Sequence, residues 1–184
     1  MKFQETKLKG NYLISLNKHK DERGFLNRIF CQKTLRPLLK EKTIRQINHT
    51  LTKKVGSVRG LHFQYPPHAE IKIVSCVKGK IWDVAVDLRK KSPTFLHYHA
   101  EILSEDNLKS FFIPEGFAHG FQTLAPNCEI LYFHTADYNA DFEGAINAND
   151  PLLSIQWPQS ITRISERDSN HPILSKDFLG IDVS

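Results

Sequence analysis

The feature that most constrains the fold is an alternation of side chains that is typical of a β-strand. Between Trp82 and Leu88 the even-numbered residues are all apolar, and in an extended chain they fall on the face opposite the odd-numbered residues. A Lys-Gly-Lys turn at residues 78–80 separates this run from the equally β-prone stretch Ile71–Val77. The two runs predict a β-hairpin whose second strand spans Lys80–Leu88.

Further short apolar runs continue this pattern along the chain. Strands are expected at Phe95–Leu103, Lys109–Ile113, Phe117–Leu124 and Glu129–Thr135, with clusters of turn residues at 104–107, 114–116 and 125–127. Strands at this spacing indicate an all-β sandwich or barrel rather than alternating βαβ units. Helix signals are weak. We expect one short helix at Thr34–Glu41, and from Asp150 onward short helices and loops that cover the barrel.

Length and charge narrow the class of protein and of partner. The 184 residues contain no internal repeat and no linker, so we expect one domain spanning residues 1–184. Lys+Arg 25 against Asp+Glu 20 gives a formal net charge of +5. This excess favours an anionic partner, which is nucleic acid, an acidic membrane or a phosphorylated small molecule.

Membrane segments and cysteines indicate the compartment. No apolar run approaches the roughly 20 residues of a membrane span, and the N-terminal residues lack the apolar core of a signal peptide. Cys31, Cys76 and Cys128 lie far apart and include no CxxC pair. They are therefore expected to be free thiols in a reducing cytoplasm.

Two segments place polar side chains on expected strands, although the interior of a small β-barrel is normally apolar. Val58–Gln64 carries Arg59 and His62. In Pro114–Phe121, proline and glycine form a tight turn that leads His119 onto the following strand. This Pro-x-Gly-x-x-His pattern resembles the second motif of the cupin barrel superfamily.

Because many cupins bind a metal ion, a metal site is the first hypothesis for these residues. Such a site needs three or four ligands, usually a His-x-His pair and a later Glu besides the second-motif histidine. The first motif here is His62-Phe63-Gln64, which lacks the second histidine, and prolines at 66 and 67 break the spacing to His68 and Glu70. The pair His97 and His99 is more typical of a solvated surface. We therefore expect no metal ion.

Acid–base chemistry suits the same residues better. In the strand that follows Cys128, Tyr132 can face the same lumen as His62 and His119. A histidine base and a tyrosine acid across a cavity can remove a proton from one side of a carbon and return it from the other. The alternative for Tyr132 is a core aromatic residue whose hydroxyl group is satisfied.

A series of motifs occurs in one order along the chain. They are Gln46-Ile47-Asn48, Val58–Gln64, Lys72-Ile73-Val74, Asp83–Arg89, Ser92–Phe95, Ile113–Phe121, Leu131-Tyr132 and Asn149-Asp150-Pro151. From about residue 10 to about residue 175 this series resembles the dTDP-4-dehydrorhamnose 3,5-epimerase family. The resemblance implies an all-β, cupin-like double-stranded β-helix (a jelly-roll barrel) with a few short helices, mainly C-terminal. It also implies an enzyme without a cofactor, and a homodimer whose N-terminal strands are shared between subunits.

By this resemblance the chain is an epimerase of a nucleotide-linked 4-keto-6-deoxyhexose in deoxysugar (rhamnose-type) biosynthesis. His62 is then the base that removes the proton from C3 or C5, and Tyr132 is the acid that returns one from the opposite face. Asp168, in the motif Ser165–Asp168, orients His62 and stabilises its imidazolium form. Lys72 stabilises the negative charge that develops on the C4 oxygen.

The resemblance also implies a set of substrate-binding residues. Arg23 and Arg59 match the diphosphate ligands, a role that suits the planar, permanently charged guanidinium group. The other expected binding residues are Arg28, Gln46, Asn48, His119, Tyr138, Glu143 and Arg167. Of these, His119 is expected at the sugar and Tyr138 against the nucleotide base. The expected partner is therefore a nucleotide-diphosphate sugar, with no nucleic acid and no membrane.

Three departures from the family pattern bear on specificity. Arg28 stands where glutamate is frequent, Phe133 where a basic residue is usual, and Asn147-Ala148 where arginine and tryptophan are favoured. They leave open the nucleotide, the sugar, and whether C3, C5 or both are inverted. The alternative functions are a single-centre epimerase or ketoisomerase on another nucleotide sugar, a non-catalytic sugar-nucleotide-binding cupin, and a metal-dependent cupin oxygenase.

Overall fold

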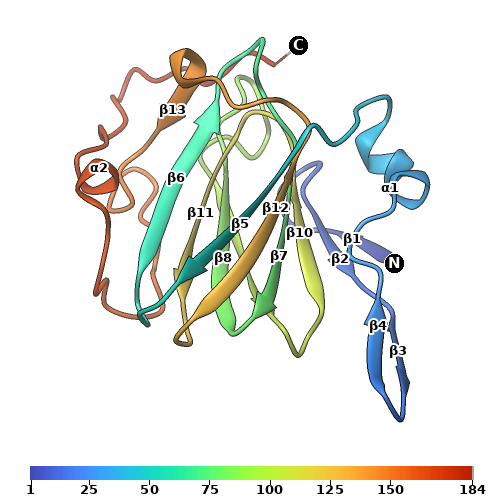
Figure 1. Ribbon diagram of the computed structural model, residues 1–184. Helices are drawn as coiled ribbons and strands as arrows, with labels where there is room; N and C mark the ends of the chain where they lie inside the picture. The colour runs from blue at the N-terminus through green and yellow to red at the C-terminus, as the bar shows by residue number, and fades with distance from the viewer. Residues whose placement is uncertain (184) are drawn as a thin grey trace.

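The computed structural model describes residues 1–183, whose strands form two sheets and a separate hairpin (Figure 1). In this part of the chain the first sheet has six strands, in the order β1 (Lys2–Glu5), β2 (Tyr12–Ser15), β10 (Lys109–Ile113), β7 (Lys72–Lys78), β12 (Cys128–His134) and β5 (Gln46–Thr52). The second sheet has five, in the order β13 (Glu143–Ala145), β6 (Val58–Gln64), β11 (Phe117–Thr123), β8 (Lys80–Asp87) and β9 (Tyr98–Ser104). β3 (Lys18–Asp21) and β4 (Gly24–Asn27) form the hairpin.

The expected hairpin between Ile71–Val77 and Lys80–Leu88 is wrong, although both strands are present. β7 pairs with β10 and β12 in the first sheet, whereas β8 pairs with β9 and β11 in the second. Gly79, at a φ of +79°, lies at the corner where the chain leaves one sheet and enters the other. Crossing between sheets at this corner gives the jelly-roll arrangement, and the all-β, cupin-like fold class is confirmed.

The strand expected from Phe95 begins three residues later, at Tyr98. The hydroxyl groups of Ser92 and Thr94 each donate a hydrogen bond of 2.6 Å to the Asp87 carboxylate. These bonds fold the segment after β8 into a turn, so it is not available for pairing.

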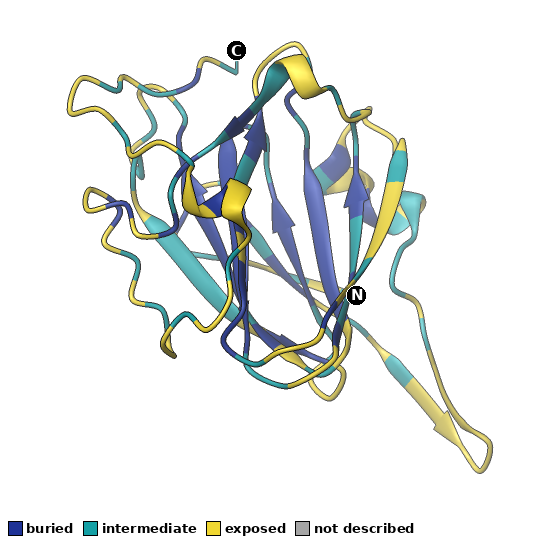
Figure 2. Cartoon of the chain, turned by 60° about the vertical axis from the view of Figure 1, so that its left-hand side comes forward, coloured by how far each residue is buried: buried dark blue, intermediate teal, exposed yellow. Residues whose placement is uncertain are grey.

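Both faces of β8 are covered, which explains why its alternation is apolar on one side and mixed on the other. Ile81 and Ala85 pack in the core between the sheets, together with Phe111 and Phe121. The opposite face, with Val84 and its even-numbered neighbours, packs beneath the C-terminal segment. That segment therefore covers the outer face of the second sheet, as expected from the sequence, and Figure 2 shows both buried (dark blue) and half-buried (teal) strands beside its loops.

The helices lie at the two sides of the barrel. α1 (Gln32–Leu39) begins two residues before the expected helix and buries Leu35 and Leu39 against the first sheet. α2 (Glu166–Ser169) and the 3-10 turn η1 (Ala140–Phe142) belong to the C-terminal half. No helix among residues 1–183 is long and apolar enough to cross a membrane. The cysteines are free thiols, as expected.

Within the second sheet, the neighbouring strands β6 and β11 approach each other very closely at Gly60. A Cβ atom on Gly60, whose φ is +117°, would lie 2.6 Å from the Cα of Gly120 and 2.7 Å from the carbonyl oxygen of His119. The β6–β11 register shifts at this point, between His119 and Phe121. Glycine is therefore required at residue 60 by space as well as by backbone conformation.

We expect Gly60→Ala to destabilise the fold more than Gly24→Ala does. Both glycines have a positive φ, +117° and +131°, but a Cβ on Gly24 would meet nothing within 4 Å. Each alanine adds backbone strain of about 1–3 kcal/mol. Gly60→Ala should lose about 2 kcal/mol more, because its methyl group overlaps the backbone of β11. Urea denaturation of the two variants measures this difference, and equal losses would contradict the role assigned to the close approach.

Candidate active site

A cavity of about 650 Å³ lies among β5, β6, β7, β11, β12 and the C-terminal segment. The residues expected from the sequence that line it are Asn48, Arg59, His62, Lys72, His119, Tyr132, Arg167 and Asp168. His62 belongs to the five-stranded sheet and Tyr132 to the six-stranded sheet. The two residues expected to act as base and acid therefore come from different walls of one cavity.

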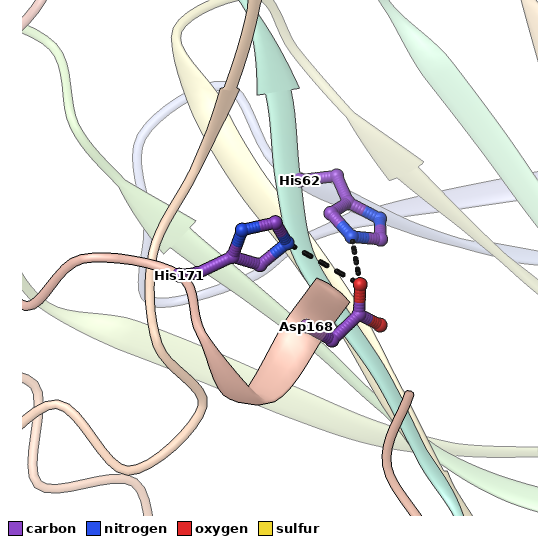
Figure 3. A group of neighbouring side chains, drawn as sticks. All are labelled: His62, Asp168 and His171. Atoms are coloured by element: carbon purple, nitrogen blue, oxygen red, sulfur yellow. Dashed lines mark hydrogen bonds and ion pairs between the residues drawn. The ribbon is translucent and has the colours of Figure 1, made fainter. Parts of the chain in front are cut away.

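The carboxylate of Asp168 joins the C-terminal segment to β6 (Figure 3). Its Oδ1 lies 3.0 Å from Nε2 of His62, and its Oδ2 accepts a 3.2 Å hydrogen bond from the backbone N–H of Gly60. Ser165 begins α2 as its N-cap, accepting a 3.0 Å bond from the N–H of Asp168. This cap fixes the turn that points Asp168 into the cavity.

The protonation state of Asp168 follows from these contacts. Burial raises the pKa of its carboxyl group, but the hydrogen bond and charge of His62 and the N–H of Gly60 outweigh it. The pKa of Asp168 therefore lies well below its ordinary value, and the group is ionised at neutral pH. Since Nε2 of His62 is held by this carboxylate, Nδ1 is the nitrogen left to accept a proton from a ligand in the cavity.

Tyr132 lies against the barrel core, with its ring centroid 6.0 Å from that of His119. Thr50 donates a long hydrogen bond, 3.5 Å, to the phenolic oxygen. Burial raises the pKa of Tyr132, so its hydroxyl group stays protonated at neutral pH. Tyr132 can therefore donate a proton.

His119 is held by a buried aspartate that the sequence analysis did not assign to the site. Nε2 of His119 lies 3.0 Å from both carboxylate oxygens of Asp83 on the neighbouring strand β8. Burial raises the pKa of Asp83, and His119 opposes that shift. An aspartate in the middle of an otherwise apolar strand was the available signal, since a buried carboxylate requires a partner.

Lys72 is held by a second buried carboxylate. Glu70 lies 3.1 Å from Nζ of Lys72 and 2.8 Å from Nδ1 of His134, which also lines the cavity. Burial raises the pKa of Glu70, but the charges of Lys72 and His134 outweigh it and lower the pKa below its ordinary value. Lys72 thus presents a fixed cation, while His134, two residues after Tyr132, was missed by the sequence analysis.

The other expected binding residues form a chain of hydrogen bonds, here called the polar rim, of which only the two ends, Asn48 and Arg167, line the cavity. Gln46 donates to Asn48 and accepts from the backbone N–H of Tyr138, at 3.2 and 3.1 Å. The hydroxyl group of Tyr138 donates to Glu143 at 3.0 Å, and Arg167 donates to the same carboxylate at 2.6 Å. Hydrogen bonds thus connect all the residues of the polar rim, from Asn48 through Gln46, Tyr138 and Glu143 to Arg167.

Arg23 and Arg28 are not brought to the cavity within one chain. Arg23 stands in the turn of the β3–β4 hairpin, where its side chain is 84% exposed and pairs with Asp21. Arg28 follows the hairpin and lines a different cavity, beside His19 and Asn27. The hairpin projects away from the barrel (Figures 1 and 2), which separates these arginines from the other expected binding residues. Arg59 does line the cavity, where its Nε donates to Thr52 at 3.1 Å.

A third imidazole, that of His171, adjoins the His62–Asp168 pair. Nε2 of His171 lies 3.3 Å from Oδ1 of Asp168, and its ring meets that of His62 edge-on at 5.4 Å between centroids (Figure 3). The sequence analysis did not single out His171. Its spacing of three residues from Asp168, within one helical turn, was the available signal.

Comparison with known proteins decides the family. The family model described as dTDP-4-dehydrorhamnose 3,5-epimerase matches residues 5–176. The chain belongs to this family. A relative of that name from Salmonella typhimurium is 44% identical over 161 residues, which cover 86% of this chain and 87% of the relative.

Solved structures agree with this assignment. The crystal structure of dTDP-4-dehydrorhamnose 3,5-epimerase from Elizabethkingia anophelis superposes with a TM-score of 0.90 at 37% identity, covering 97% of this chain and 98% of that one. An epimerase from Legionella pneumophila, solved in complex with dTDP-4-keto-L-rhamnose, gives a TM-score of 0.90 at 32% identity, covering 100% and 99%.

The ionised Asp168 predicts a pH-dependent contribution to stability. A carboxylate whose pKa is lowered by folding stabilises the protein above its unfolded pKa of about 3.9 and loses this effect as the pH falls towards the folded value. The difference in unfolding free energy between wild type and Asp168→Asn should therefore persist above about pH 4. Below it, the difference should shrink by up to about 1.4 kcal/mol per pH unit.

Urea denaturation between pH 3 and pH 7 measures this difference. Asp106→Asn, which removes an exposed carboxylate, is the control and should show no comparable loss. A wild-type advantage over Asp168→Asn that stays constant down to pH 3 would contradict the assignment.

Proposed function

We propose that the chain is an epimerase that inverts C3 and C5 of a nucleotide-linked 4-keto-6-deoxyhexose of the dTDP-4-dehydro-6-deoxyglucose type. The observation that carries this proposal is the His62–Asp168 pair, 3.0 Å apart, in one cavity with a protonated Tyr132. The family membership of the chain supports the same reaction class. The reaction belongs to deoxysugar (rhamnose-type) biosynthesis.

The chemistry follows from the C4 ketone of such a sugar, which acidifies the hydrogens on C3 and C5. His62 removes one of these protons through Nδ1, and the Asp168 carboxylate stabilises the imidazolium that forms. The electrons pass to the C4 oxygen, where the Lys72 ammonium group stabilises the enolate. Tyr132 then donates a proton to the carbon from the opposite wall, and the centre is inverted.

Substrate recognition is proposed for the arginines and for the polar rim. Arg59 contacts the diphosphate, because a guanidinium group can bind two phosphate oxygens at once. The exposed ring of Tyr138 stacks on the nucleotide base. His119 contacts the sugar through the nitrogen that Asp83 does not hold, and Gln46, Asn48, Glu143 and Arg167 bind other polar groups.

We infer that the protein acts as a homodimer in the cytoplasm, where its free thiols stay reduced. The support for a dimer is the β3–β4 hairpin, which carries Phe25 and Leu26 at 58% and 72% exposure on a projecting element. Exposed apolar residues on such an element are typical of an interface. A partner's cavity that receives this hairpin would gain Arg23 and Arg28 as substrate ligands.

Solvent exchange tests the proposed reaction. In D₂O, the wild-type protein should introduce deuterium at C3 and C5 of dTDP-4-keto-6-deoxyglucose, measured by NMR. His62→Ala should lower the exchange rate by about 10²–10⁴-fold, because the base is lost. Tyr132→Phe should retain exchange but lose the inverted product, because the base can return the proton only to its own face.

The matched control is His49→Ala, which removes an exposed histidine on β5 that pairs with Glu129 outside the cavity. It should exchange at the wild-type rate, and circular dichroism should show all variants folded. Absence of exchange with the dTDP, CDP, GDP and UDP forms of the sugar would refute the proposal. Exchange at one carbon only would indicate a single-centre epimerase.

Sedimentation tests the dimer. The wild-type protein should sediment at twice the 21.2 kDa of one chain. Leu26→Asp, in the hairpin, should shift the equilibrium towards the monomer, because it places a charge in the interface. Leu179→Asp is the matched control, since Leu179 has the same 72% exposure but lies in the C-terminal segment. A single 21 kDa species at every wild-type concentration would rule the dimer out.

A further inference from the structure

The imidazole of His171 lies beside the carboxylate of Asp168, which also contacts His62. Nε2 of His62 and Nε2 of His171 both face the same oxygen, Oδ1 of Asp168 (Figure 3). We propose that these three side chains form an inhibitory zinc site, in which Zn²⁺ takes the His62 nitrogen that otherwise contacts the carboxylate. The inhibitory effect rests on the proposed function, whereas zinc binding itself does not.

The distances suit a zinc ion. With zinc–ligand bonds of about 2.0–2.1 Å, neighbouring ligand atoms of a tetrahedral site lie about 3.3 Å apart. The two imidazole nitrogens lie 3.0 and 3.3 Å from Oδ1, and all three ligand atoms lie within 4.8 Å of one another. Zinc binding requires the separation of the two imidazole nitrogens, at most 4.8 Å here, to reach about 3.3 Å. Two imidazoles and one carboxylate form a donor set that suits zinc.

His171 also presents an unsatisfied nitrogen. Nε2 of His171 lies only 3.3 Å from Oδ1 of Asp168, yet it is buried and forms no hydrogen bond among the residues that the structure describes. Its backbone is anchored, because its N–H donates to the carbonyl of Asp168 and its own carbonyl accepts from Asn147. A buried polar atom of this kind is costly to leave unsatisfied, and a metal bond satisfies it.

The carboxylate is prepared for the same role. Oδ2 of Asp168 is engaged by the Gly60 N–H, so the group is held in place while Oδ1 stays directed at the two imidazoles. The His62–Asp168 side of the site faces the cavity, which leaves a fourth position for water. Three protein ligands and one open position are typical of an exchangeable zinc site.

Zinc binding and base catalysis exclude each other through the tautomer of His62. A metal bond at Nε2 uses the lone pair of that nitrogen, so the single proton of the neutral ring moves to Nδ1. Nδ1 then has no lone pair with which to take the substrate proton. The proton count of the ring is unchanged, and removal of the metal restores the base. Zinc should therefore inhibit this protein reversibly.

Calorimetry with ZnCl₂ tests the site without substrate. A Cys31→Ser background removes the half-buried thiol, which is a competing ligand, and the titration is run in nucleotide-free buffer. One Zn²⁺ should bind per chain. His171→Ala and His171→Gln should each bind it more than about tenfold more weakly, since even a lost outer-shell contact costs that much. His49→Ala, which removes a surface histidine–carboxylate pair, should bind as the background does.

The exchange assay then tests inhibition. Free Zn²⁺ is fixed with a metal buffer, because the diphosphate of the substrate binds zinc itself. Zinc should abolish exchange by the Cys31→Ser protein, and EDTA should restore it. At the same free Zn²⁺ concentration, His171→Gln should exchange as fast as the same variant does without metal. Mg²⁺ should not inhibit, because it prefers oxygen ligands.

Two results would overturn the proposal. One is the absence of stoichiometric zinc binding, and the other is unchanged affinity in both His171 variants. If the protein exchanges no substrate proton under any condition, the proposed function fails, yet calorimetry still decides the zinc site. The two proposals therefore fail in distinguishable ways.

Discussion

The carboxylate of Asp168 is the contact on which the rest of the site depends. One oxygen accepts from the backbone of Gly60 and the other lies against His62, so a single side chain joins the C-terminal segment to β6 and orients the His62 imidazole. His62 and Asp168 are 106 residues apart in sequence. Their pairing requires both the N-cap of α2 at Ser165 and the close approach of β6 to β11 at Gly60.

Charged side chains that face the cavity are paired with one another, and His62 and Tyr132 differ in their electrostatic surroundings. Asp83 holds His119 and Glu70 holds Lys72, so these two buried carboxylates each have a cationic or imidazole partner. Unpaired, such groups would carry a large desolvation penalty. Tyr132 has no carboxylate partner, and burial keeps it neutral. One cavity thus contains an imidazole that faces a carboxylate and a phenol that stays protonated, an arrangement that suits the proposed base and acid.

Much of the site could be predicted from the sequence, because the chemically reactive residue types occur in short, recognisable motifs. The segments around His62, His119, Tyr132 and Asp168 carry residue types whose roles the family resemblance implied, and the structure brings all four to one cavity. The hydrogen-bonding partners were harder to predict. The spacing of His171 from Asp168 can be read in the sequence, but only the turn that follows α2 shows that the two side chains meet. The exposed position of Arg23 follows from the β3–β4 hairpin, which projects from the barrel.

The alternation of apolar residues between Trp82 and Leu88 shows the same difference between what the sequence and what the fold decides. By itself the sequence determined that Ile71–Val77 and Lys80–Leu88 are strands, because side-chain direction in an extended chain is a local property. Only the tertiary structure decided that they belong to different sheets, since strand pairing depends on partners far along the chain. The site divides likewise. The sequence determined which side chains can move a proton, and the fold decided which partners surround each one, because those contacts join residues up to about a hundred positions apart.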